Sequence, residues 1–109
     1  MSVSKSRPLT RDLLLQYFLG AARPRDGWLV GMEIEKMGRA ARDGRPLPYV
    51  AEGPSVRRVL EFIQEVRGGS PIMEGDHLIG LDASWGTISL EPGGQVEWSS
   101  KPAATLREL

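Results

Sequence analysis

The stretch Leu90-Glu91-Pro92-Gly93-Gly94-Gln95-Val96-Glu97-Trp98-Ser99 decides the fold. Its polar residues have one parity and its apolar residues have the other, provided that the glycine pair does not shift the register. The polar set is Glu91, Gln95, Glu97 and Ser99, and the apolar set is Leu90, Val96 and Trp98. This alternation is typical of antiparallel strands with one buried face, while proline and paired glycines indicate a bulge, a close ligand approach or a plain hairpin turn.

A second acidic segment, Gly31-Met32-Glu33-Ile34-Glu35, lies nearer the start of the chain. On a strand, Glu33 and Glu35 would point to the same side, roughly 6–7 Å apart. Magnesium prefers carboxylate oxygens and also binds nucleotide phosphates, so this pair suits an ATP site. The alternative is a solvated face of an ordinary antiparallel sheet.

The remaining patterns predict an α+β fold in one partial domain over residues 1–109, with an antiparallel sheet and two flanking helices. Residues 1–8 are expected to be flexible. One helix is expected after Thr10 and before Pro24, and a second is expected to open at Gly53-Pro54 and stop at Gly68-Gly69. Strands are expected at residues 28–37, 78–83, 87–90 and 95–99, with a loop at residues 38–53 and a turn at Ser84-Trp85-Gly86.

The last residues have the spacing of a helix capping box, with Thr105 followed three positions later by Glu108. A helix is therefore expected to begin at Thr105, at the point where the sequence stops. This pattern favours a piece of a longer protein, and a fraying tail is the alternative.

Composition narrows the classes of function. Fourteen basic and fourteen acidic residues cancel, which disfavours a general role in binding nucleic acid or an anionic membrane. No apolar run approaches the ~20 residues of a membrane span, and the first residues lack a signal-peptide core, so a cytoplasmic location is expected. Without cysteine, any metal must use oxygen or histidine ligands.

The chain resembles the glutamate–cysteine ligases of plants and many bacteria. Residues 90–99 are similar to that family's hallmark Leu-Glu-Pro-Gly-Gly-Gln-x-Glu-x-Ser, and residues 31–36 to its Gly-x-Glu-x-Glu-Lys motif. Pro48-Tyr49, Pro102 and Thr105-Leu106 also fit in order and spacing. The resemblance extends from about Leu13 to Leu109, and the hallmark is its most specific part.

This resemblance implies a glutamine-synthetase-like catalytic fold that joins the side-chain carboxylate of glutamate to the amine of cysteine, the first step of glutathione synthesis. It implies ATP and Mg²⁺, an acyl-phosphate mechanism, metal ligands at Glu33, Glu35, Glu91 and Glu97, and substrate or ATP contacts at Gln95, Glu97 and Ser99. Because the family's chains are several times longer, this chain is expected to be inactive alone. Trp98 and Ser100-Lys101 depart from the family's usual small residues.

Three other groups of residues are assigned to ordinary structural roles. Asp76-His77 is expected to be a surface pair near a turn, and the loop arginines Arg39, Arg42 and Arg45 are expected to be solvated rather than bound to phosphate. The three tryptophans, Trp28, Trp85 and Trp98, are expected in the core, with Trp85 as the one that could also touch a ligand.

Two alternatives remain at this stage. The chain could be a small non-catalytic binding or regulatory protein that retains a ligase-like sheet, or it could belong to a related ligase with another amine acceptor. An exposed sheet edge could also pair two copies into a homodimer.

Overall fold

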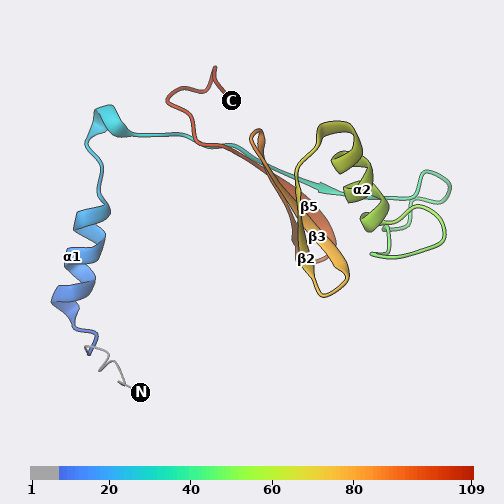
Figure 1. Ribbon diagram of the computed structural model, residues 1–109, viewed down its shortest axis with the longest axis horizontal. Helices are drawn as coiled ribbons and strands as arrows, with labels where there is room; N and C mark the ends of the chain where they lie inside the picture. Colours follow the sequence, from blue (N-terminus) through green and yellow to red (C-terminus); the bar gives the residue numbers. More distant parts are fainter. Residues whose placement is uncertain (1–7) are drawn as a thin grey trace.

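The computed structural model describes residues 8–109 and has the α+β architecture that the sequence predicts (Figure 1). Its elements are α1 (Arg11–Ala21), the short 3₁₀ helix η1 (Arg25–Gly27), β1 (Glu33–Met37), α2 (Val56–Arg67), β2 (Ser70–Glu74), β3 (His77–Ala83), β4 (Gly86–Glu91) and β5 (Gln95–Ser100). The five strands form one open sheet in the order β1-β5-β4-β3-β2, and every neighbouring pair is antiparallel.

The tight turn between β4 and β5 preserves the parity of the hallmark segment. Gly93 and Gly94 have φ values of 84° and 77°, a region that L-residues with side chains avoid. The Gly94 N–H donates to the Glu91 carbonyl at 3.3 Å, and Glu91 pairs directly with Gln95. The glycine pair therefore reverses the chain without shifting polar residues onto the buried face.

An apolar row across four strands forms the centre of the fold. Ile34, Trp98, Ile88 and Leu81 are successive partners across β1, β5, β4 and β3, so their side chains share one face. Leu60 of α2 packs against this face and is fully buried, as is Leu81. Figure 1 shows α2 on this one side of the sheet, and the opposite side carries no helix.

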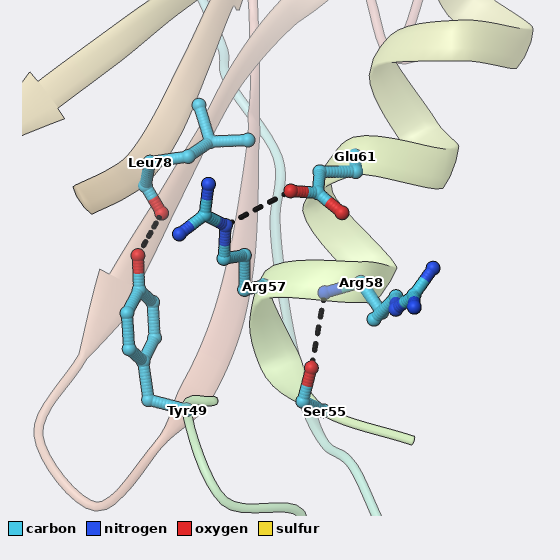
Figure 2. A network of polar contacts seen from close by, with 6 residues as sticks. All are labelled: Tyr49, Ser55, Arg57, Arg58, Glu61 and Leu78. Carbon is cyan, nitrogen blue, oxygen red and sulfur yellow. Dashed lines mark hydrogen bonds and ion pairs between the residues drawn. The ribbon is translucent and has the colours of Figure 1, made fainter. Parts of the chain in front are cut away.

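The loop before α2 fixes the start of that helix. The Ser55 hydroxyl accepts from the Arg58 N–H, while the carbonyls of Pro48 and Tyr49 accept from the first backbone N–H groups of α2. The Tyr49 hydroxyl donates to the Leu78 carbonyl of β3 at 2.9 Å, as Figure 2 shows. These bonds satisfy donors that a helix start leaves open and tie the helix to the sheet.

The helix α1 forms as predicted but lies away from the sheet. Thr10 caps it by accepting from the Leu13 N–H, yet none of its residues is buried. The radius of gyration is 19.6 Å, whereas a compact domain of this length has about 13 Å. Figure 1 shows α1 at the far end of an extended segment, so only α2 packs on the sheet.

Four features of the secondary structure differ from the sequence predictions. The strand expected from residue 28 begins at Glu33, because β5 ends at Ser100 and Pro102 has no N–H to continue the ladder; only Val30 and Ala103 form an isolated bridge there. The second helix begins after Ser55 rather than at Gly53-Pro54, because Ser55 supplies the cap. The strand β2 was not predicted, because the glycines before it were assigned only to the end of the second helix and Pro71 has no N–H for a ladder.

The fourth difference is at the end of the chain. The Glu108 carboxylate accepts from the Thr105 N–H, as a capping box requires, but residues 104–107 form a bend followed by a turn and no helix. The loop at residues 38–53 is confirmed, apart from an isolated bridge between Arg39 and Pro46. The prediction of flexibility for residues 1–8 falls outside the described residues, except for the exposed Pro8.

Because the core is small, truncating one buried side chain should strongly lower the stability of the fold. Leu81→Ala should lower the free energy of unfolding by about 2–5 kcal/mol, because it opens a cavity beneath Leu60 at a fully buried position. Urea denaturation followed by tryptophan fluorescence measures this loss. The matched variant Leu19→Ala on α1, where the side chain is 64% exposed, should change the same quantity by less than about 0.5 kcal/mol. Equal losses would contradict the placement of the core.

Candidate functional site

The face of the sheet opposite α2 is polar, and the strand register assembles it from two separate parts of the sequence. Residues directly opposite each other in an antiparallel pair point to the same face. One row contains Glu33, Ser99, Thr87 and Asp82, a second contains Glu35, Glu97 and Ser89, and a third contains Met37, Gln95 and Glu91. The structure thus brings all six predicted site residues onto neighbouring strands.

The closest approach of the two acidic segments is the pair Glu35 and Glu97. Their Cα atoms are direct partners between β1 and β5, where Cβ atoms are about 4.5–5.5 Å apart. Neither carboxylate forms an ion pair with a lysine or arginine within residues 8–109. Like charges in this position destabilise a sheet, so a cation between them would be favourable.

The Glu97 carboxylate is held in place by its own strand. The Ser99 hydroxyl donates to Glu97 Oε1 at 2.8 Å, which leaves the other carboxylate oxygen of Glu97 for another partner. Glu33 lies opposite Ser99 beside a hollow of about 360 Å³ that Gly31 and Ser100 also line. The two predicted metal-binding residues of β1 are therefore exposed along an open surface rather than enclosed.

Glu91 and Gln95 lie one row further along the same face. They are partners at the base of the glycine turn, and both are only partly exposed. Glu91 is diagonal to Glu97 rather than directly opposite it, because Ser89 occupies the position across from Glu97. The acidic face (Glu33, Glu35, Glu91 and Glu97) is thus a strip across three strands.

The sequence analysis missed a polar cluster at the other end of the Glu33 row. Asp82 Oδ1 accepts from the Lys101 ammonium at 3.2 Å and from the Thr87 hydroxyl at 3.3 Å. Lys101 lowers the pKa of Asp82, chiefly through this hydrogen bond. Because the folded pKa is depressed, any stability from the pair is present above a pH of about 4 and is lost as the pH falls through the folded pKa. The parity of β3 and β4 was the signal that could have located Asp82 and Thr87.

Within residues 8–109, no three acidic or histidine side chains converge closely enough to surround a metal ion. The donors of the acidic face nonetheless have the chemistry that a hard cation prefers, since all are carboxylate oxygens. The strip offers one side of a coordination shell, and water, substrate phosphate or other protein groups would have to complete it.

The residues assigned to structural roles are mostly as predicted. His77 and Asp76 form an exposed pair, with His77 Nε2 3.7 Å from Asp76 Oδ1. Arg39 donates to the carbonyl of Gly44 in its own loop, and all three loop arginines are exposed. Trp98 and Trp85 pack against the core.

Two aromatic details were not foreseen. Trp28 is 63% exposed, so the prediction that it fills the core is wrong; its indole N–H donates to the Arg23 carbonyl in the segment that leads away from the sheet. Trp85 donates in the same way to the Arg67 carbonyl at the end of α2. That bond joins the end of α2 to the turn between β3 and β4.

Comparison with known proteins relates the chain to a family of enzymes. No family model matches the chain. Among curated proteins, it is 36% identical over 107 residues to a chloroplastic glutamate–cysteine ligase of Medicago truncatula and to one of Arabidopsis thaliana. It is 35% identical over the same length to the chloroplastic glutamate–cysteine ligase B of Oryza sativa subsp. japonica.

The chain is similar to glutamate–cysteine ligases along nearly its whole length. The matches cover 98% of it, which confirms the resemblance predicted from the hallmark segment. The chain spans only 20–21% of the length of these relatives. Their names describe chloroplastic proteins, which does not agree with a plain prediction of the cytoplasm; among residues 8–109, no helix is long and apolar enough to cross a membrane.

The facing carboxylates predict an unusual effect of a neutralising change. Glu35→Gln should raise the free energy of unfolding by about 0.2–1 kcal/mol in a buffer without divalent cations, because it removes repulsion from Glu97. Chemical denaturation measures this gain. Glu65→Gln, an exposed change on α2, serves as the control and should have no comparable effect. A destabilised Glu35→Gln variant would show that the two carboxylates do not oppose each other.

Proposed function

We propose that this chain supplies the acidic strands of an ATP- and Mg²⁺-dependent ligase that joins glutamate to cysteine. The observation that carries the proposal is the direct pairing of Glu35 with Glu97, which places two acidic segments far apart in the sequence on one face. The similarity to glutamate–cysteine ligases supplies the reaction, because an acidic sheet face alone occurs in many unrelated proteins.

The proposed roles follow from the positions on the polar face. Glu33, Glu35, Glu91 and Glu97 would hold Mg²⁺, which neutralises phosphate charge and polarises the transferred phosphoryl group. Ser99 orients Glu97 through the hydrogen bond between their side chains. Gln95 and Ser99 would contact ATP or a substrate beside the carboxylates, since both lie on the same face of β5.

The proposed reaction has two steps. The side-chain carboxylate of glutamate attacks the γ-phosphorus of ATP, which forms an acyl phosphate and releases ADP. The amine of cysteine then attacks the acyl carbon, the bond to phosphate breaks, and the amine loses a proton as the amide forms. Positioning and charge neutralisation drive such chemistry, so no nucleophilic side chain of this chain is required.

The 109-residue chain is proposed to be inactive alone. Its acidic face binds cations, but the described residues place no lysine or arginine within ion-pair distance of that face to clamp the triphosphate, and the one lysine on the same side, Lys101, pairs with Asp82. The compartment stays a prediction. The amine acceptor also stays a prediction, because no described residue of the acidic face identifies the amine.

Magnesium binding tests the site directly. Isothermal titration of the chain with MgCl₂ should show weak binding with a Kd on the order of 10⁻³ M, at the weak end of the range for calcium sites with oxygen ligands. The double variant Glu33→Gln, Glu35→Gln should abolish the heat of binding, whereas Glu61→Gln on α2 should leave it unchanged. An unchanged titration of the double variant would refute the assignment of the acidic face.

A chimeric enzyme tests the reaction. In the chimera, this chain replaces the aligned segment of the Medicago truncatula ligase, and product formation is followed with glutamate, ATP and a panel of amines. We expect cysteine to be the preferred amine, and Glu97→Gln to lower kcat/KM at least about tenfold through a weakened metal site. Preference for another amine would favour a related ligase, and a chimera that folds but has no activity would favour a non-catalytic protein.

A further inference from the structure

An open apolar groove lies on the helix side of the sheet, on the face opposite the acidic residues. It has a volume of about 380 Å³ and lies between α2 and the paired strands β1 and β5. Its walls include Ile34, Val59, Ile63, Val96 and Trp98. Lys36 is the one charged residue among the described residues that line it.

The groove is open because α2 does not cover the whole apolar face. The helix packs on β3, where Leu60 meets Leu78 and Leu81. Val59, which faces the groove, is 37% exposed, and Ile34 on the opposite wall is 39% exposed. Figure 1 shows β1 running toward the loop of residues 38–53, with α2 as the one helix beside the sheet. Exposed apolar surfaces of this kind mark contacts with other protein segments or membranes, or grooves that bind ligands.

We propose that the groove is the docking surface for an apolar segment from the part of a glutamate–cysteine ligase that lies outside the aligned region. This inference rests on the proposed function. The relatives contain about four further residues for every residue that aligns with this chain, since the match covers 98% of it and 20% of them. A polypeptide of that length has ample material to fill an open face beside the catalytic strands.

The lining also defines the chemistry of the occupant. Aliphatic and aromatic side chains fit between Val59 and Ile34, because they exclude water without leaving unsatisfied polar groups. An acidic group next to them would pair with Lys36, whose strand partner Val96 offers it no counter-charge. A segment docked here would contact β1 and β5 on the face opposite the carboxylates. These two strands hold Glu35 opposite Glu97. The occupant would thereby fix the spacing of the acidic face.

Two other occupants are distinguishable from this one. The helix α1 has an exposed apolar surface that includes Leu14 and Phe18, and a second copy of the chain could insert the same helix. Either would cover the groove in the isolated chain, whereas the proposed segment covers it only in the longer enzyme.

Thiol labelling tests the proposal, because the chain has no cysteine of its own. Val59→Cys should react readily with a maleimide in the isolated chain, at a rate independent of protein concentration. In the chimera with the Medicago truncatula ligase, the same residue should react at least about tenfold more slowly. Val66→Cys lies on the same helix outside the groove, is 59% exposed, and should be slowed much less. Mass spectrometry of the labelled peptide gives each rate.

Each outcome has one meaning. Equal labelling of Val59→Cys in the chain and the chimera would overturn the groove proposal, even if the chimera is active. Protection of Val59→Cys in an inactive chimera would support the groove and count against the proposed ligase function. Protection in the isolated chain would overturn the proposal, in favour of a second copy if it rises with concentration and of α1 if it does not.

A second measurement needs no chimera. Val59→Asp in the isolated chain should leave the thermal midpoint within a few degrees of the unsubstituted protein, because the groove is open there. A much larger drop would show that Val59 is already covered, and would also overturn the proposal.

Discussion

Leu60 of α2 and Leu81 of β3 are fully buried against each other, and the arrangement of the sheet depends on this contact. The helix can cover only one face, so each strand must present its apolar side chains to that face at the same time. Alternation along a strand then sends the remaining side chains to the opposite face. The acidic face is therefore a consequence of where the apolar residues are buried, and a shift of one residue in any strand would bury a carboxylate.

The glycines of the structure protect this arrangement at two points. Gly93 and Gly94 adopt backbone angles that reverse the chain while Glu91 and Gln95 remain partners. At Gly86 a side chain would collide with the Ser99 carbonyl and the Trp98 indole nitrogen, so glycine lets β4 and β5 approach closely. The strands that carry the polar residues are thus held together by positions that have no polar role themselves.

Three surfaces of the described residues are left uncovered by the fold. The helix α1 has no buried residue, the groove beside α2 is open, and the acidic face would supply only one side of the metal site that we propose. An isolated helix of eleven residues is marginal in water, and α1 has no buried residue whose packing would stabilise it. The similarity to ligases of about five times the length gives these surfaces a common explanation in the function we propose.

Sequence alone determined the family resemblance, the α+β class, the parity of the hallmark segment and the location of both acidic segments. These follow from local chemistry, because alternation along a strand, the cap at Thr10 and the glycine turns each involve residues that are close together in the sequence. The sequence did not reveal β2, because a proline such as Pro71 is unusual in a strand. The Gly75-Asp76 turn was the one local signal of the hairpin between β2 and β3. Nor could the sequence show that Glu35 faces Glu97, that Asp82 joins Lys101, or that Trp28 and α1 lie outside the core. Those facts depend on which strands become neighbours and how far α2 covers them, and both are decided by packing between residues distant along the chain.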